Sequence, residues 1–169
     1  MHRPALSIAE ATPMVPVLKN VAKRVAERHQ VPSDCIVINA ESTTENFFVQ
    51  GREADIELVF RNVIDNAVKY SLPEPHVDVT VELKKKNRVL VRVADNGPGI
   101  SLADRGQVFR RFVRLGSELE RATPGTGLGL YLVKSIVKQL RGRVFIKGHL
   151  TKRGTIIEVD LHRANSGKD

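Results

Sequence analysis

Two glycine-rich segments contain the residues whose types and spacing best suit chemistry. The first reads Asp95-Asn96-Gly97-Pro98-Gly99-Ile100. The second begins about 25 residues later and reads Gly125-Thr126-Gly127-Leu128-Gly129-Leu130. An acid leads the first segment, and the second runs directly into an amphipathic stretch. Because a helix that follows a glycine turn can bind phosphate, the pair predicts two opposite walls of a nucleotide pocket.

Asp95 is the candidate for reading a purine base. The exocyclic amine of adenine donates hydrogen bonds, and a carboxylate in a dry cleft is a strong, selective acceptor for it. Gly97 and Gly99 have no Cβ, so the backbone beside Asp95 can adopt positive φ and approach a flat base. The competing interpretation is a simple turn, because Asp-Asn-Gly standing alone is typical of one.

The second segment predicts a phosphate site. Residues 126–139 have helical periodicity, and their apolar face consists of Leu128, Leu132, Ile136 and Leu140. The first turn of such a helix presents unpaired N–H groups and the positive end of the helix dipole. The competing interpretation is an ordinary entry loop to a helix.

A third element upstream, residues 57–70, is predicted to be a helix with a polar stripe. At about 100° per residue, Asn62, Asn66 and Lys69 lie close together beside an apolar face. That face consists of Ile56, Val59, Val63, Ile64 and Ala67. Amide oxygens suit Mg²⁺, which borrows phosphate oxygens for its other ligands. A solvated helix side is the alternative for the stripe taken alone.

These segments together resemble a known family. Residues 62–71, Asn-Val-Ile-Asp-Asn-Ala-Val-Lys-Tyr-Ser, look like the N box of sensor histidine kinases, and residues 95–100 look like their G1 box. Residues 109–112, Phe-Arg-Arg-Phe, resemble the F box, and residues 125–130 resemble the G2 box. The resemblance spans residues 15 to 162. It implies the ATP-binding catalytic domain of the Bergerat type, shared with gyrase, Hsp90 and MutL ATPases.

The resemblance also implies roles for individual residues. Asn62 and Asn66 would hold Mg²⁺, Lys69 would contact a phosphate, and Asp95 would accept from the adenine amine. The catalytic set implied is Asn62, Lys69 and Arg111, with Arg114 as an alternative to Arg111. The residues implied to surround the nucleotide are Asn66, Lys69, Tyr70, Asp95, Gly97, Gly99, Ile100, Gly125, Thr126, Gly127, Leu128, Gly129, Leu130 and Thr155. Residues 101–124 would form the ATP lid. Arg110 and Arg141 depart from the usual pattern, outside the core chemistry.

The residue type at position 62 distinguishes the ATP-hydrolysing members of this superfamily from those that transfer the phosphoryl group. In the ATP-hydrolysing relatives its position is a glutamate that activates water, and an amide cannot act as a general base. Asp65 is near, but at about 100° from Asn66 it faces elsewhere on the helix. Phosphoryl transfer to an outside acceptor is therefore the better interpretation.

In the family that acceptor is a histidine followed by an acid, on a separate two-helix dimerisation domain. The five histidines here are His2, His29, His76, His149 and His162, and none precedes an acid. The expected partners are such a domain and a response regulator, with an isolated monomer and a homodimeric full-length protein. The alternatives are a regulatory ATP-binding module, a serine/threonine kinase of the same fold, and an interaction domain that has lost its ligand.

Composition predicts one soluble domain, and the resemblance implies a cytoplasmic location, either in a soluble protein or as part of a membrane sensor. The 169 residues are 41% hydrophobic, enough for a core, and the single cysteine excludes an internal disulfide. No apolar run approaches a membrane span. The net charge of +8 favours anionic partners, but the basic residues are scattered, so specific nucleic-acid binding is not expected. The densest basic run, residues 84–88, is predicted to be a hairpin turn.

The predicted fold is an α/β two-layer sandwich, in which three helices cover one face of a mixed, mostly antiparallel, five-stranded sheet. Helices are expected at 15–29, 57–70 and 126–139, with a short one at 102–109. Strands are expected at 35–39 and 46–49, in a hairpin at 76–94, and at 143–147 and 155–161. Residues 1–12 are expected to form a flexible lead, residues 13–163 the catalytic domain, and residues 164–169 a tail.

Overall fold

The computed structural model describes residues 10–40, 47–110, 129–148 and 153–165. In chain order the elements are β1 (Ala11–Pro13), α1 (Met14–His29), the 3-10 turn η1 (Ser33–Cys35), β2 (Ile36–Ala40), β3 (Phe48–Gln50), α2 (Glu53–Lys69), β4 (Val77–Lys84), β5 (Arg88–Asp95), α4 (Gly129–Gln139), β6 (Arg143–Gly148) and β7 (Thr155–His162).

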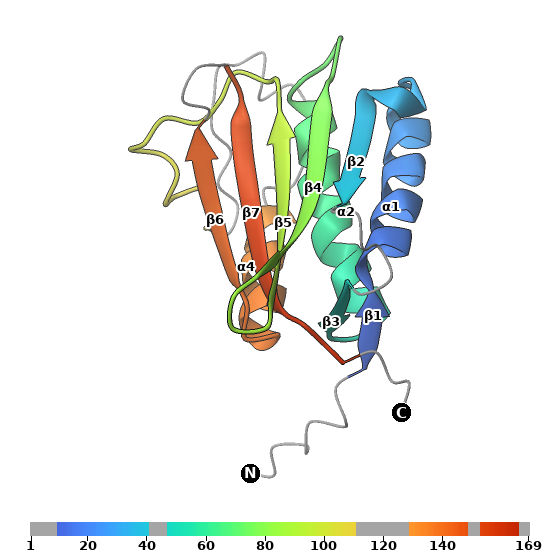
Figure 1. Cartoon of the computed structure of the whole chain (residues 1–169). Coiled ribbons are helices and arrows are strands. Elements are labelled where there is room, and N and C mark those ends of the chain that lie inside the picture. Colours follow the sequence, from blue (N-terminus) through green and yellow to red (C-terminus); the bar gives the residue numbers. More distant parts are fainter. Residues whose placement is uncertain (1–9, 41–46, 111–128, 149–152, 166–169) are drawn as a thin grey trace.

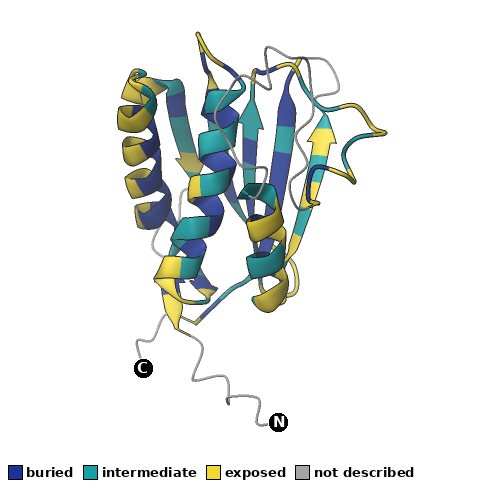
Figure 2. Cartoon of the chain, turned by 180° about the vertical axis from the view of Figure 1, so that it is seen from behind, coloured by how far each residue is buried: buried dark blue, intermediate teal, exposed yellow. Residues whose placement is uncertain are grey.

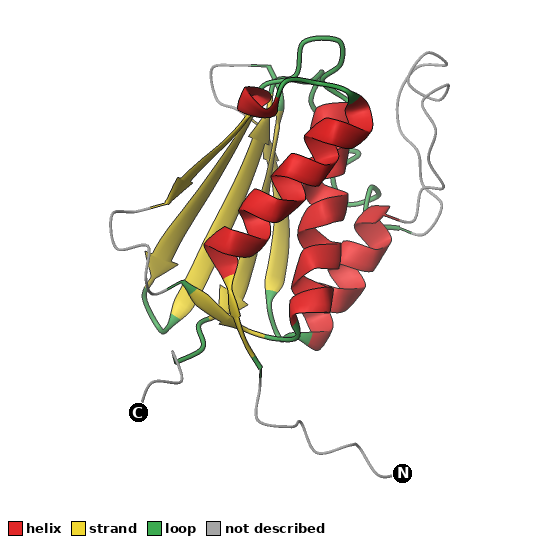
Figure 3. Cartoon of the chain, turned by 90° about the vertical axis from the view of Figure 1, so that its right-hand side faces the viewer, coloured by secondary structure: helices red, strands yellow, loops and turns green. Residues whose placement is uncertain are grey.

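Five of the strands form one sheet in the order β2-β4-β5-β7-β6. The β2–β4 pair is parallel, and the other neighbours are antiparallel. Figure 1 shows α1, α2 and α4 behind this sheet, and the side view in Figure 3 shows the resulting two layers. The predicted sandwich of three helices on one face of a five-stranded sheet is therefore confirmed for the described residues.

The core lies between the two layers. Along β4 and β5 alternate residues are buried against the helices, as period-two patterning requires. Seen from behind, the helices carry buried residues on their inner sides and exposed residues on their outer sides (Figure 2). The fully buried side chains include Leu18 and Val25 from α1, Ile56, Phe60 and Val63 from α2, Val79 from β4, Val91 from β5, and Val159 from β7.

Three local expectations need correction. The strand expected at 46–49 begins at Phe48 and does not join the main sheet, because β3 pairs with β1 instead. Ala11 and Thr12, expected in the flexible lead, belong to that small sheet. Residues 102–109 form successive hydrogen-bonded turns and no continuous helix. Gly106 interrupts this segment, and glycine is a poor helix former.

The helix expected at 57–70 starts one turn earlier, at Glu53. Glu53 and Asp55 lie in its first turn, where negative charge is favourable to the helix dipole. Arg52 also pairs with Asp55 at 3.0 Å across this turn. The early start places the Asn62 to Lys69 stripe in the second half of α2, close to the end at which the helix meets the loop after β5.

The sheet face that the helices do not cover carries an ion-pair network. Glu158 contacts Arg92 and Lys147, each at 3.0 Å, and Asp160 contacts Arg88 at 2.8 Å. The long cationic side chains cover the two carboxylates, which explains why both acids are buried on an otherwise uncovered face.

Candidate nucleotide-binding site

Asp95 ends β5 beside the start of β7. Its Oδ1 accepts a hydrogen bond from the Gly97 N–H at 2.9 Å and another from the Thr155 N–H at 3.1 Å. Because β5 and β7 are antiparallel neighbours, the end of one strand and the start of the other meet at the same edge of the sheet. Two predicted base-site residues, 60 positions apart, are thereby brought together, and the two N–H groups fix the orientation of the carboxylate.

The loop after β5 packs between the end of α2 and Gly154. A Cβ on Gly97 would lie 3.0 Å from the Tyr70 carbonyl oxygen and 3.1 Å from Asp95 Oδ1. Gly99 has φ of +85°, and a Cβ there would lie 3.1 Å from the Gly154 carbonyl oxygen. A side chain would therefore be strained at Gly99 by the positive φ, and at Gly97 it would crowd the end of α2.

Asn62 connects α2 with the first turn of α4. Its Nδ2 donates to the Leu58 carbonyl oxygen at 2.8 Å, one turn earlier in the helix. Its Oδ1 lies 3.0 Å from the position that a Cβ on Gly129 would occupy. The N-box helix and the start of the G2 helix are thus in direct contact, and the small size of Gly129 allows this approach.

The rest of the polar stripe continues along α2. Asn66 lies one turn beyond Asn62, and both side chains are half-buried. The Lys69 Nζ lies 5.1 Å from the centre of the Tyr70 ring, in a cation–π contact. The amides, the ammonium group and the aromatic ring therefore follow one helix toward the Gly97 loop, in the order that the sequence predicts.

Asp65 contacts the end of α1. Its Oδ1 is 2.8 Å from His29 Nε2 and 3.6 Å from Arg28 Nη1, both at the end of α1. The carboxylate side chain is 19% exposed. The Asp65 carboxylate thus joins α2 to α1, and its Oδ1 is occupied by these contacts.

Three other predicted site residues lie in the loop after β5, in α4 and in β7. Ile100 is half-buried, and its carbonyl oxygen accepts from Arg105 Nε at 3.1 Å. Leu130 packs against the core, and Thr155 is buried. The predicted residues outside the described ranges are Arg111, Arg114, Gly125, Thr126, Gly127 and Leu128, together with most of the lid.

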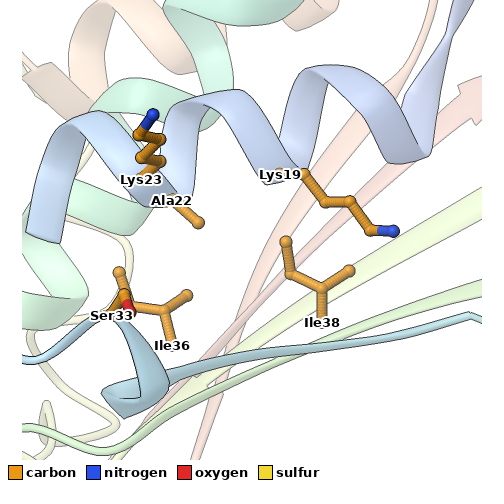
Figure 4. Close-up of a pocket in the computed structure, with 6 residues that line it drawn as sticks. All are labelled: Lys19, Ala22, Lys23, Ser33, Ile36 and Ile38. Carbon is orange, nitrogen blue, oxygen red and sulfur yellow. The ribbon is translucent and has the colours of Figure 1, made fainter.

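A cavity of about 270 Å³ lies elsewhere, between α1 and the edge strand β2 (Figure 4). Its lining residues are Lys19, Ala22, Lys23, Ser33, Ile36 and Ile38. None of these is a predicted site residue.

Within the described residues, no group of three or more His, Cys, Asp or Glu side chains could hold a metal ion. The donors that the site does offer are carboxamides. Asn62 uses its Nδ2 on the Leu58 carbonyl, so its oxygen is the atom directed at the first turn of α4. An amide oxygen is a hard donor, and this orientation fits Mg²⁺ held together with phosphate oxygens.

Ser71 was given no role by sequence reasoning, although it ends the N-box segment. The structure places its Oγ 3.3 Å from the position of a Cβ on Gly97, and therefore close to the Asp95 loop. No local sequence signal predicts this approach, because it depends on how the loop after β5 packs against α2.

Comparison with known proteins identifies the class of this domain. Residues 51–165 match the model of the histidine kinase-, DNA gyrase B- and HSP90-like ATPase family. That range contains the described parts of the site, from α2 to β7. The chain belongs to this family.

The most similar relatives are sensor kinases. The chain is 34% identical over 139 residues to the sensor protein kinase WalK of Staphylococcus saprophyticus, a match that covers 82% of this chain and 23% of WalK. It is 41% identical over 99 residues to the sensor protein CiaH of Streptococcus pneumoniae, covering 59% of this chain and 22% of CiaH. The chain thus spans less than a quarter of the length of these relatives.

Solved structures agree with this relationship. The mycobacterial sensor histidine kinase MprB superposes with a TM-score of 0.75 at 27% identity, over 92% of this chain and 98% of that one. The catalytic domain of histidine kinase ThkA has the same TM-score at 18% identity, over 93% and 97% of the two chains, which shows the shared fold. The chain is homologous to the ATP-binding catalytic domain of sensor histidine kinases.

Proposed function

We infer that this chain is the catalytic domain of a two-component sensor histidine kinase, and that it transfers the γ-phosphoryl group of ATP to a histidine on a separate dimerisation domain. The observation that carries this proposal is the junction of three separated segments. Asp95 is fixed by the Gly97 and Thr155 N–H groups, and Asn62 contacts the first turn of α4.

Base recognition would rest on Asp95. The carboxylate is held at Oδ1 by two backbone donors, so its orientation is set before a ligand arrives. A pre-oriented acceptor suits the adenine amine and disfavours guanine, which presents a carbonyl oxygen at the same place on the ring. Gly97 and Gly99 would let the base lie close to the backbone, with Ile100 and Thr155 at the borders of its pocket.

Phosphate binding would rest on α2 and α4. The N-terminal end of α4 offers N–H groups and a positive dipole end, and Lys69 adds a positive charge from α2. Asn62 and Asn66 would hold Mg²⁺, which neutralises charge on the phosphates during phosphoryl transfer. Lys69 and the N–H groups of α4 would orient the phosphate chain, because this reaction depends on positioning and charge neutralisation.

The acceptor would come from another segment or subunit. Asn62 carries no carboxylate to activate water, and Asp65 is engaged by His29. We therefore expect slow hydrolysis without an acceptor.

The proposed partners are a histidine-containing dimerisation domain and, downstream, a response regulator. We further propose a cytoplasmic location, a monomeric isolated domain and a homodimeric full-length protein. Among the described residues, no helix is both long and apolar enough to span a bilayer.

A trans-phosphorylation assay tests this proposal. The purified chain is incubated with γ-labelled ATP and Mg²⁺ and a separately made two-helix dimerisation domain from a sensor kinase. Label on the histidine, absent when that histidine is replaced by alanine, is the expected result. Label on serine or threonine would identify a serine/threonine kinase instead. ATP binding without transfer to any of several such domains would indicate a regulatory nucleotide module.

A further inference from the structure

Ser71, just beyond α2, carries a buried hydroxyl for which the described residues provide no hydrogen-bond partner. The residue is 8% exposed, and its Oγ is sealed from solvent. Buried hydroxyl groups are nearly always hydrogen-bonded, because leaving one unpaired costs stability. Alanine would fill most of the same space without this cost, so the presence of serine calls for an explanation.

The hydroxyl lies beside the predicted base acceptor. A Cβ on Gly97 would be 3.3 Å from Ser71 Oγ, 3.1 Å from Asp95 Oδ1 and 3.0 Å from the Tyr70 carbonyl oxygen. Three oxygens from two segments therefore converge on one face of Gly97. Only the hydroxyl among them can donate a hydrogen bond, because the carboxylate and the carbonyl are acceptors alone.

We propose that Ser71 is a second base-recognition residue, which donates a hydrogen bond to N1 of adenine, directly or through one water, once nucleotide is bound. This inference rests on the proposed function. Adenine presents a donor, the amine, next to an acceptor, N1. Asp95 supplies the acceptor that the amine needs, and the adjacent Ser71 hydroxyl supplies the donor that N1 needs.

A hydrogen bond to the base would give this buried hydroxyl the partner that the described residues do not provide. Buried hydroxyl groups are normally hydrogen-bonded, and exceptions to this rule are expected where a site binds a ligand. Because Gly97 has no Cβ, no side chain at position 97 stands beside the Ser71 hydroxyl and the Asp95 carboxylate. The proposal requires the Gly97 loop to admit N1 to this hydroxyl when nucleotide binds.

The test compares Ser71→Ala with a matched control, Thr80→Val. Thr80 carries the other buried hydroxyl that lacks a partner among the described residues, and it lies in the middle of β4 on the sheet face that the helices leave uncovered. Affinity for Mg²⁺-ATP is measured by calorimetry, and thermal stability is measured without nucleotide. We expect Ser71→Ala to bind ATP about fivefold to tenfold more weakly without any loss of stability, and Thr80→Val to bind ATP like the wild type.

A modified nucleotide ties the effect to N1. In 1-deaza-ATP a C–H group replaces N1, so it should bind the wild-type chain more weakly than ATP and should bind Ser71→Ala as it binds the wild type. A loss of affinity that is equal for both nucleotides would overturn the role of Ser71. So would a Ser71→Ala variant that melts earlier but binds ATP normally. A wild-type chain that binds neither nucleotide would overturn the proposed function itself.

Discussion

We propose that selection of the base depends on the Asp95 carboxylate. Its Oδ1 is committed to two backbone N–H groups, from Gly97 and Thr155. An asparagine could keep these two contacts through its own Oδ1, but it would then place an NH₂ group where a carboxylate oxygen stood. Charge and hydrogen-bond polarity can therefore be changed at this position without removing the contacts that join β5 to β7.

We predict that Asp95→Asn weakens ATP binding by about tenfold and weakens GTP binding much less. The new NH₂ group would face the adenine amine, a donor against a donor, but would suit the carbonyl oxygen of guanine. Calorimetric titration with both nucleotides, alongside a melting curve to check the fold, provides the measurement. Equal losses for the two nucleotides would remove Asp95 from base recognition.

A second residue-scale prediction concerns Asn66. Asn66→Ala should abolish Mg²⁺-dependent nucleotide binding, because it removes one of the two carboxamides proposed to hold the ion. The fold should remain intact, since Asn66 is only half-buried and its main chain still accepts from the Tyr70 N–H. Titration of ATP with and without magnesium measures this effect. Wild-type affinity in the variant would refute the metal assignment.

At the scale of elements, the site depends on contacts between helices that are far apart in sequence. Gly129 starts α4, and Asn62 lies in the second half of α2. The 3.0 Å between Asn62 Oδ1 and a Cβ at position 129 leaves no ordinary space for a side chain. The amide of Asn62 is also bonded to Leu58, so it has little freedom to move aside.

Gly129→Ala should therefore weaken ATP binding severalfold by displacing either Asn62 or the first turn of α4. The variant and the wild type are compared by nucleotide titration and thermal melting. The contact between α2 and α4 would have no role in binding if Gly129→Ala bound ATP as tightly as the wild type.

The ion-pair network on the uncovered sheet face leads to a pH prediction. Burial raises the pKa of the Glu158 carboxyl, but hydrogen bonds from Lys147 and Arg92 outweigh this effect, and the pKa lies below its ordinary value of 4.5. The charged carboxylate therefore stabilises the fold above pH 4.5, and this contribution is lost as the pH falls through the lower folded pKa.

Glu158→Gln should accordingly be less stable than the wild type at pH 7, by roughly 1–2 kcal/mol. The difference should shrink as the pH falls below 4.5, because the wild-type carboxyl then becomes neutral as well. Denaturant unfolding at several pH values provides the test. A stability difference that does not change across this range would show that the charge of Glu158 is not what matters.

Local pattern was enough to predict much of the fold. The alternation of Val77, Val79 and Val81 predicted a strand with one buried face, and the run 84–88 predicted its turn. The turn is confirmed, with positive φ at Lys86 and Asn87. In contrast, nothing local shows that β3 pairs with β1, because short strands obtain their partners from tertiary packing. The contact between Asp95 and Thr155 likewise depends on β5 and β7 being neighbours in the sheet, and no local pattern predicts that strand order.

For the candidate site as well, the positions of residues within a single element could be predicted from the sequence. Helical spacing placed Asn62, Asn66 and Lys69 on one side of α2 and Asp65 about 100° from Asn66. In the structure Asp65 contacts His29 at the end of α1. The contacts that make the site one unit, between Gly129 and Asn62 and between Gly97 and Ser71, join separate elements. Residue periodicity within a single element does not contain that information.

At the scale of the whole molecule, this chain corresponds to one part of its longer relatives. The alignment with WalK covers 82% of this chain but only 23% of WalK. The proposed function requires a phosphoacceptor on another domain, and the net charge of +8 favours acidic partner surfaces. The separation of nucleotide site and acceptor would let the position of one domain relative to the other control transfer.

We propose that α2, the loop after β5 and α4 form one magnesium-nucleotide site in which no carboxylate is positioned to activate water. This proposal is tested by following the fate of γ-labelled ATP on the purified chain, with and without an added two-helix histidine domain. We expect label on that histidine and only slow phosphate release in its absence. Rapid, steady hydrolysis by the chain alone would contradict it.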